Sequence, residues 1–199
     1  MNKLLVFGKF DPSEVKLADT SLGNMISLET KKMPHTFGRF TLEKTKISII
    51  ERLINKVMRS GQGKRKLSGK FIRGRGGCGK KIQATVIVSD AFDLIFEQTK
   101  QNPIQLLIKA IENAGPREDT TRIKRGGVSY TVSVDVSPRK RVDEALKNIA
   151  LAAFSASFNS RVSAQDALAK EIILAAKEDN ASFSIKRRDE VERIAKSSR

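Results

Sequence analysis

The stretch Asn113–Pro138, NAGPREDTTRIKRGGVSYTVSVDVSP, contains the end of a helix, a basic turn and a strand. Helix-spaced apolar residues before it stop at Ala114, where Gly115 can take the left-handed conformation and Pro116 prevents the helix from continuing. From Val128 the sequence alternates strictly between apolar and polar residues, which predicts a strand with one apolar face. The stretch therefore predicts a helix that gives way to a β-structure.

Residues 117 to 136 are predicted to form a β-hairpin with a basic tip. Gly126-Gly127 can supply the positive φ angles that a primed two-residue hairpin turn requires. Just before this turn, Arg122, Lys124 and Arg125 bring three cations close to residues without side chains. Because a bare backbone lets a phosphate approach closely, the tip suits phosphate contact. An ordinary solvated hairpin end is the alternative interpretation.

The same residues resemble a known family. GPREDTTRI at 115–123 and VDVSP at 134–138, followed by Arg141-Val142, resemble the universal head protein of the small ribosomal subunit, protein seven in bacterial numbering and protein five in older eukaryotic naming. The spelling is similar to that of the archaeal and eukaryotic branch. The similarity covers nearly all of Met33 to Arg199 and continues through Pro34-His35-Thr36, Glu51-Arg52-Leu53, Asn102-Pro103, Ser184-Ile185-Lys186-Arg187 and Ile194-Ala195-Lys196-Ser197.

Composition limits the class of protein independently. A chain of 199 residues, 39% apolar and 30% charged, can form one domain with a moderate core plus extensions. A net charge of +16 favours a polyanionic partner, with nucleic acid first and an anionic membrane surface second. The apolar runs are far shorter than the roughly 20 residues that span a bilayer, and the N-terminus lacks a signal-peptide core, so no membrane partner is expected. Cys78 alone allows no internal disulfide and no cysteine-based zinc site, which fits a reducing cytosol.

The chain divides into an arm and a helical domain. Residues 1 to 45 show no sustained period and predict an arm with little structure of its own, ordered by a partner. Its His35 is interpreted as a packing or hydrogen-bonding residue, because no second His could share a metal or a proton. From 46 to 199, apolar residues at helical spacing predict about six helices. The expected fold is mainly α, a single domain with one protruding β-hairpin.

Residues 60 to 81 are predicted to form a basic loop. The segment from 52 to 81 contains eleven Lys or Arg residues and no acid. A disordered loop that becomes ordered on RNA is the functional interpretation, and a merely solubilising loop is the alternative. The family resemblance covers Gly74 to Lys81, whereas Ser60 to Arg73 resembles an insertion, so the contacts of the insertion cannot be taken from the family.

This loop also contains the best argument for an enzyme. Gly74 to Lys80 has the spacing of a phosphate-binding loop of nucleotide hydrolases. Lys81, however, stands where a Ser or Thr should bind magnesium, and only Phe71-Ile72 precede the loop where a buried strand is required. The candidate acidic partner, Asp90, falls in a predicted helix. Nucleotide hydrolysis is therefore disfavoured.

The resemblance implies a structural component of the small-subunit head in cytoplasmic ribosomes, without enzymatic activity, metal or cofactor. It implies binding to the three-prime major domain of small-subunit rRNA, a role in nucleating head assembly, contacts with neighbouring head proteins, and a position near the exit-site tRNA and the mRNA exit path. An RNA-binding or RNA-chaperone protein outside the ribosome is the alternative, since basic loops and hairpins alone do not identify the RNA. From charge, position and family match, RNA contacts are expected from Arg52, Lys56, Lys80, Lys81, Arg117, Arg122, Lys124, Arg125, Arg139, Lys140 and Arg141.

Overall fold

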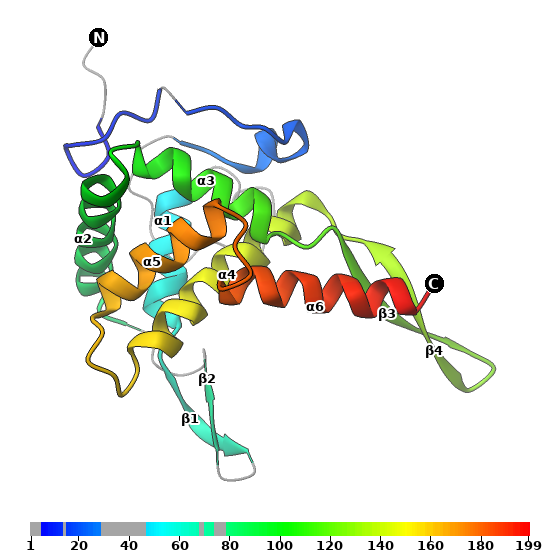
Figure 1. The fold of residues 1–199 in the computed structure, drawn as a ribbon. Coiled ribbons are helices and arrows are strands. Elements are labelled where there is room, and N and C mark those ends of the chain that lie inside the picture. The colour runs from blue at the N-terminus through cyan, green and yellow to red at the C-terminus, as the bar shows by residue number, and fades with distance from the viewer. Residues whose placement is uncertain (1–4, 14, 29–46, 68–69, 74–78) are drawn as a thin grey trace.

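A computed structural model describes residues 5–13, 15–28, 47–67, 70–73 and 79–199. Within these residues the chain forms six α-helices, one 3-10 helix and two antiparallel β-hairpins (Figure 1). The mainly helical fold class is thereby confirmed. In chain order the elements are η1 (Thr20–Met25), α1 (Ile49–Arg59), β1 (Gln62–Leu67), β2 (Lys70–Arg73), α2 (Lys81–Thr99), α3 (Pro103–Ala114), β3 (Glu118–Arg125), β4 (Val128–Asp135), α4 (Pro138–Ser157), α5 (Ala164–Ala176) and α6 (Phe183–Ser197).

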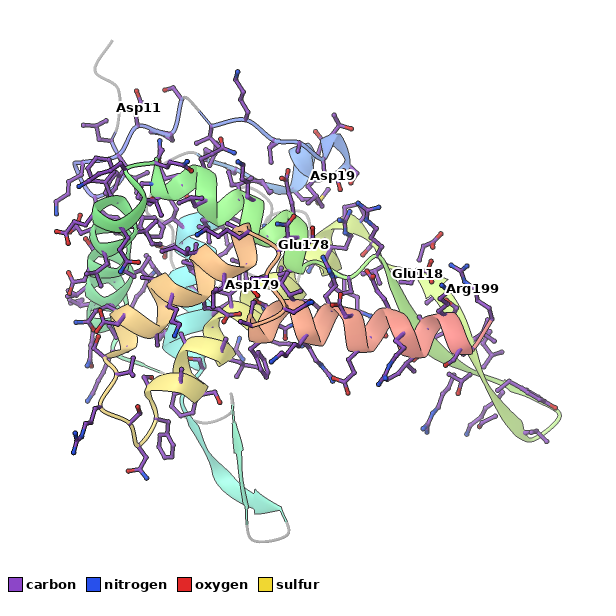
Figure 2. The ribbon with its side chains drawn as sticks, in the orientation of Figure 1. Asp11, Asp19, Glu118, Glu178, Asp179 and Arg199 are labelled. Atoms are coloured by element: carbon purple, nitrogen blue, oxygen red, sulfur yellow. The ribbon has the colours of Figure 1, made fainter. Side chains whose placement is uncertain are left out.

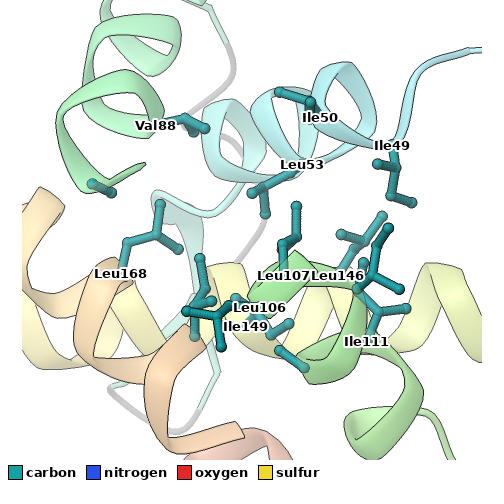
Figure 3. Packing of buried hydrophobic residues seen from close by; sticks show 14 of the residues in the cluster. Ile49, Ile50, Leu53, Val88, Leu106, Leu107, Ile111, Leu146, Ile149 and Leu168 are labelled. Carbon is teal, nitrogen blue, oxygen red and sulfur yellow. The ribbon is translucent and has the colours of Figure 1, made fainter. Parts of the chain in front are cut away.

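The core lies where the apolar stripes of α1 to α5 meet. Helix α5 packs against α2, α3 and α4, and α4 also contacts α1 and α6. Leu53, Leu107, Leu146 and Leu168 come from four different helices and are fully buried (Figure 3). Burying such a side chain stabilises the fold by about 1.5–3 kcal/mol relative to leaving it exposed. The apolar periodicity that predicts these helices also predicts most of their buried residues, but Val86 and Phe96 of α2 are 51% and 45% exposed.

The arm is more ordered than its sequence predicts. In its described residues, 5–13 and 15–28, Leu22 is buried, and Phe10 packs edge-on against Phe92 with ring centroids 6.3 Å apart. The backbone amides of Ala18 and Asp19 donate to Glu112 on α3 over 2.9 and 3.0 Å. The arm lies across one side of the helical body (Figures 1 and 2). This part of the arm is ordered by the body itself, because isolated apolar residues without a period can still fill gaps between helices.

Gly115 ends α3 for a different reason from the one predicted. Its φ and ψ are −81° and 114°, an extended conformation, so the left-handed expectation is wrong. A Cβ at this position would lie 3.2 Å from the carbonyl oxygen of Ile111 and 3.4 Å from the Cβ of Arg141. The glycine is therefore favoured by the close approach of α3 to the first turn of α4.

The hairpin β3–β4 matches its prediction. Gly126 and Gly127 have φ angles of 58° and 82°, as a primed turn requires. The register pairs Ile123 with Tyr130 and runs without a bulge from Glu118 opposite Asp135 to the turn. The ribbon projects beyond the body, and α6 lies beside its base (Figure 1).

A second hairpin replaces part of the predicted loop. Strand β1 pairs with β2, so residues 62–67 and 70–73 form an antiparallel ribbon rather than a disordered segment. Like β3–β4, the β1–β2 hairpin projects away from the helical body (Figure 1). The segment shows neither a helical spacing of apolar residues nor a clear alternation of apolar and polar residues. The sequence therefore does not predict this hairpin. Gly74 to Cys78 and the motif Pro34-His35-Thr36 lie outside the described residues.

Candidate nucleic-acid interface

The protruding hairpin presents one polar face with two cations. Side chains that are paired across an antiparallel ribbon lie on the same face. Arg122 pairs with Thr131 and Lys124 pairs with Ser129, and all four residues are exposed. Among the described residues, none of the ion pairs involves Arg122 or Lys124. This face therefore offers uncompensated charge together with hydroxyl groups, the combination that binds phosphate and sugar oxygens.

The opposite face of the hairpin is apolar and exposed along β4, whereas β3 contributes the polar residues Asp119 and Thr121 to it beside Ile123. Val128, Tyr130, Val132 and Val134 are between 38% and 54% exposed, and Ile123 faces Tyr130. Val136, which follows β4 at the base of the hairpin, is buried. The side chain of Arg125 lies outside the described residues. Alternation in the sequence thus places these residues on one face correctly, while the projection of the ribbon keeps that face away from the core.

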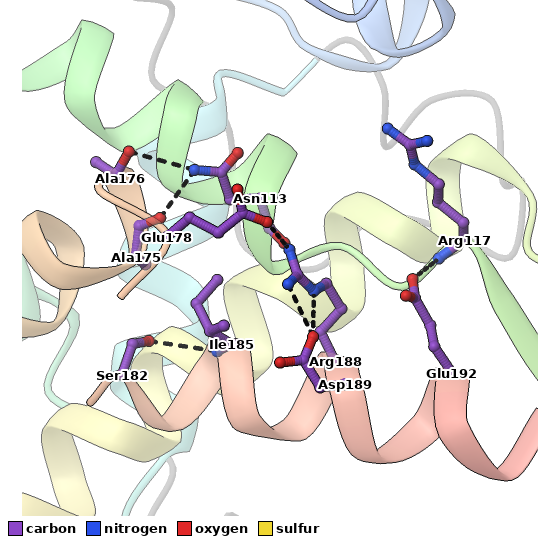
Figure 4. Close-up of polar contacts among 10 residues, drawn as sticks. All are labelled: Asn113, Arg117, Ala175, Ala176, Glu178, Ser182, Ile185, Arg188, Asp189 and Glu192. Atoms are coloured by element: carbon purple, nitrogen blue, oxygen red, sulfur yellow. Dashed lines mark hydrogen bonds and ion pairs between the residues drawn. The ribbon is translucent and has the colours of Figure 1, made fainter. Parts of the chain in front are cut away.

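The base of the hairpin is held by α6 and the ends of α3 and α5 (Figure 4). The backbone amide of Arg117 donates to Glu192 Oε1 over 2.8 Å. Arg188 on α6 donates to the carbonyl oxygen of Asn113 over 2.8 Å and forms an ion pair with Glu178 at 2.6 Å. At the far end of α6, Arg199 pairs with Glu118 of β3 (Figure 2). These contacts fix the direction in which the hairpin leaves the body.

The start of α4 adds cations at the same base. Lys140 is about half exposed and lies 2.5 Å from the carboxylate of Asp119. The hydrogen bond that Lys140 donates lowers the pKa of Asp119. Arg139 is partly exposed, and Arg117 is exposed across the base. Arg117 and Arg139 are therefore available to a polyanion, whereas Asp119 already balances the charge of Lys140.

Two of the residues that are expected to contact RNA are buried in the structure. Arg52 and Arg141 are each 7% exposed. Arg52 donates to the carbonyl oxygen of Met25 over 2.8 Å and pairs with Asp143 at 3.2 Å. Arg141 pairs with Asp19 at 2.9 Å. Both guanidinium groups hold the arm against the body, and burial removes them from a surface that RNA could reach.

The remaining expected cations lie near α1 and α2. Lys56 lies 3.7 Å from Asp143, and burial lowers the pKa of its amine. Lys81 pairs with Glu51. Lys80 is exposed and precedes α2 in a left-handed conformation with a φ of 53°. Of these three, Lys80 is the one that offers its charge to a ligand.

The acids that neutralise these cations could not be recognised from spacing. Asp19 and Arg141 are 122 positions apart, and Arg52 and Asp143 are 91 apart. A charge pattern predicts a partner only within a helix turn or across a short hairpin. The sequence therefore identifies the basic segments but not which of their cations are already paired.

The pair of Asp19 with Arg141 should make stability depend on pH. Hydrogen bonds from Ser21 and then Arg141 lower the pKa of Asp19 from 3.8 to about 2. Because the pKa is lower in the folded state, the contribution is fully present above about pH 4 and is lost as the pH falls towards 2. Asp19→Asn should lower the free energy of unfolding by about 1 kcal/mol at pH 6, after allowance for partial exposure. Urea denaturation at pH 6, 4 and 3 should show roughly half of that difference at pH 3. A difference that stays constant over this range would contradict the assignment.

The described residues contain no cluster of three or more His, Cys, Asp or Glu that could hold a metal ion, and no helix among them is long and apolar enough to cross a membrane.

Strand β2 belongs to a two-stranded ribbon, and Asp90 lies within α2. A phosphate-binding loop of a nucleotide hydrolase instead follows a buried strand of a larger sheet. The positions of β2 and Asp90 therefore differ from those expected in a nucleotide hydrolase.

The family model and the similar proteins all indicate the same family. The family model described as ribosomal protein S7p/S5e matches residues 24–199. A protein of Archaeoglobus fulgidus named small ribosomal subunit protein uS7 is 48% identical over 200 residues, which cover 99% of this chain and 96% of that protein. Proteins of the same name from Methanothermobacter thermautotrophicus and Thermoplasma volcanium are each 46% identical, over 97% and 98% of this chain and 98% and 100% of their own lengths. With a family match over most of its length and such relatives, the chain belongs to the ribosomal protein S7p/S5e family, whose members are structural proteins of the ribosome and not enzymes.

Proposed function

We propose that this protein binds the three-prime major domain of small-subunit rRNA and helps to nucleate assembly of the subunit head. The observation that carries the proposal is the polar face of β3–β4. There Arg122 and Lys124 are exposed beside the hydroxyl groups of Ser129 and Thr131, without an acidic partner in the described part of the chain. Arg117, Arg139 and Lys80 extend the available positive charge, and Arg125 and Lys140 belong to the same basic segments. The protein acts in the cytoplasmic ribosome.

The proposed recognition relies on phosphate contacts and on RNA shape. Side chains cannot read the deep, narrow major groove of an A-form helix, whereas a projecting ribbon can follow its phosphates. Neutralising phosphates releases counterions, so affinity should fall as salt rises. Specificity then comes from how well the positions of the cations match the folded RNA.

We further propose that the hairpin and the C-terminal helix lie near the exit-site tRNA and the mRNA exit path, next to neighbouring head proteins. Exposed apolar residues on one face of β3–β4 support a protein neighbour on that side: Ile123, Val128, Tyr130, Val132 and Val134. Contiguous apolar surface of this kind typically marks a contact site. The polar face remains free for nucleic acid.

The test compares a head-domain fragment of small-subunit rRNA with an unrelated structured RNA of equal length over a range of salt. The purified chain should bind the head fragment far more tightly, and the preference should survive as salt rises. Equal binding to both RNAs and joint dissociation in salt would mean that the chain acts as a general polycation. That result would support an RNA-binding role outside the ribosome instead.

Neutralising the two hairpin cations should weaken binding to the head fragment in a defined way. The double variant Arg122→Gln with Lys124→Gln should lose roughly tenfold in affinity, and the slope of log affinity against log salt should decrease by about 2. Lys109→Gln with Lys170→Gln removes the same charge from exposed positions on α3 and α5 and serves as the matched control. If both double variants behave alike, net charge rather than the hairpin face determines binding.

A further inference from the structure

A cavity of about 430 Å³ lies at the root of the β1–β2 hairpin. Ser60 and Gly61, just before β1, and Gly79, just after the connecting segment, form part of its rim. Its walls come from the end of α1, the start of α2, the C-terminal half of α4 and the start of α5. The hairpin emerges from the body at this place (Figure 1).

Most of the residues that line the cavity are apolar, and four of them are alanines. The larger apolar side chains of the lining are those of Val57, Met58, Ile87, Leu168 and Phe154. The ring of Phe154 also packs against Phe158, with centroids 5.3 Å apart. Small residues next to an aromatic ring leave space for a flat apolar group, which the ring can stack against.

Polar groups in the lining of the cavity can form hydrogen bonds with the edge of a flat heteroaromatic group. The exposed amide of Gln83 can both donate and accept. The hydroxyls of Ser60 and Ser157 donate to the carbonyl oxygens of Val57 and Ala153 over 2.7 and 2.9 Å, which leaves their lone pairs able to accept. A nucleobase presents complementary donors and acceptors along its edge.

The charge around this cavity distinguishes it from two larger hollows of the described structure. One of those is lined by Glu51 and Lys81. The other is lined by three acids, Asp19, Glu112 and Asp135, together with Arg117 and Arg141. Among the described residues that line the cavity at the β1–β2 root, none has a carboxylate and the charged one is Lys80. Lys80 precedes α2, whose N-terminus has no side-chain cap and whose first turn contains no acid. Amide groups and the helix dipole favour an anion there.

We propose that this cavity receives the base of one unpaired RNA nucleotide, whose phosphate binds Lys80 and the start of α2. The inference rests on the RNA-binding function proposed above and adds the form of RNA that the protein accepts. A mostly apolar lining with one cation matches a nucleotide, in which a flat base and a phosphate are joined by a sugar. Stacking of a base on an aromatic side chain tolerates any sequence, so the cavity recognises an extruded nucleotide rather than a particular base.

The test uses two RNA pentamers of equal charge and the full chain. One pentamer is abasic at every position except for a single central adenine, and the other is abasic throughout. The unaltered protein should bind the adenine pentamer on the order of tenfold more tightly. Ala164→Leu, which fills the rim, and Phe154→Leu, which removes the ring but keeps apolar volume, should each bring this ratio close to one. Lys80→Gln should weaken both pentamers while leaving the ratio unchanged.

Ala181→Leu is the matched control, because Ala181 is exposed and lies outside the cavity lining. Unfolding midpoints of all variants identify any that fail to fold, and the two cavity variants provide independent tests. Equal binding of the pentamers by the unaltered protein, or a ratio that survives both cavity variants, would overturn the proposal. Binding of the head-domain rRNA fragment, measured in parallel, shows separately whether the RNA-binding function stands.

Discussion

Replacing Glu171 by Ala should lower the free energy of unfolding by about 3 kcal/mol. Glu171 is 8% exposed, and its carboxylate joins α5 to the start of α6. It accepts hydrogen bonds from the hydroxyl of Ser182 over 2.7 Å and from the amide of Ser184 over 2.9 Å, and the hydroxyl of Ser184 also donates to it. Both serines are completely buried, and their hydroxyls lie 3.0 Å apart. In the variant one hydroxyl can donate to the other, but the second hydroxyl and the amide of Ser184 are left without an acceptor. Each buried donor left unpaired costs about 1–3 kcal/mol.

The neighbouring bonds explain why this carboxylate matters to the whole helix. The hydroxyl of Ser182 also accepts from the amide of Ile185 over 3.3 Å, which caps α6. Helix α6 in turn holds the base of the β3–β4 hairpin through Arg188 and Glu192. Loss of Glu171 should therefore loosen the hairpin as well as the helix, and weaken binding to rRNA.

Urea denaturation followed by circular dichroism measures the loss. Glu171→Gln keeps one acceptor oxygen and should cost only about 1 kcal/mol. Glu190→Ala removes an acid from the exposed side of α6, where Glu190 pairs with Arg187, and should change stability by less than about 0.5 kcal/mol. A loss from Glu171→Ala as small as that from Glu190→Ala would show that solvent replaces the carboxylate.

Replacing Arg141 by Ala should lower the free energy of unfolding by about 2–3 kcal/mol. The guanidinium group of Arg141 is 2.9 Å from Asp19 and 3.4 Å from the hydroxyl of Ser21, so it ties η1 to the start of α4. Removing one partner of a buried pair leaves the other charge uncompensated, which typically costs about 3–5 kcal/mol. The expected loss is smaller here because Asp19 is 27% exposed and because the Nε of Arg141 already lacks a partner among the described residues.

The adjacent residue provides the control for Arg141. Lys140→Ala removes a cation whose side chain is 52% exposed, and it should change stability by less than about 1 kcal/mol. Arg141→Lys keeps the charge but lacks the planar fork, so an intermediate loss is expected. Under conditions where all variants are folded, Arg141→Ala should bind the head-domain rRNA fragment within about twofold of the unaltered protein, since only exposed cations reach phosphates. An affinity loss without a stability loss would place Arg141 in the interface after all.

Local patterns in the sequence predict much of this fold. Alternation from Val128 and the pair Gly126-Gly127 predict the β3–β4 hairpin, because strand period and turn geometry depend only on residues a few positions apart. Asn102 caps α3 and Ser163 caps α5, as hydroxyl and amide side chains before a helix suggest. The motifs from Gly115 to Val142 likewise suffice to indicate the family. Each of these features is encoded within one or two adjacent elements.

The tertiary structure alone decides which cations of the basic segments can meet RNA. Arg122 and Arg141 look equally suitable in the sequence, yet one is exposed on a projecting ribbon and the other is buried against Asp19. The reason for a glycine at position 115 is likewise visible only in the tertiary structure. A side chain there would crowd Arg141, whereas the backbone angles of Gly115 do not require glycine. By itself, the sequence determined the helices, the principal hairpin and the family. Burial and ion pairing between distant residues depend on how the helices pack, and only the packed chain fixes the binding face.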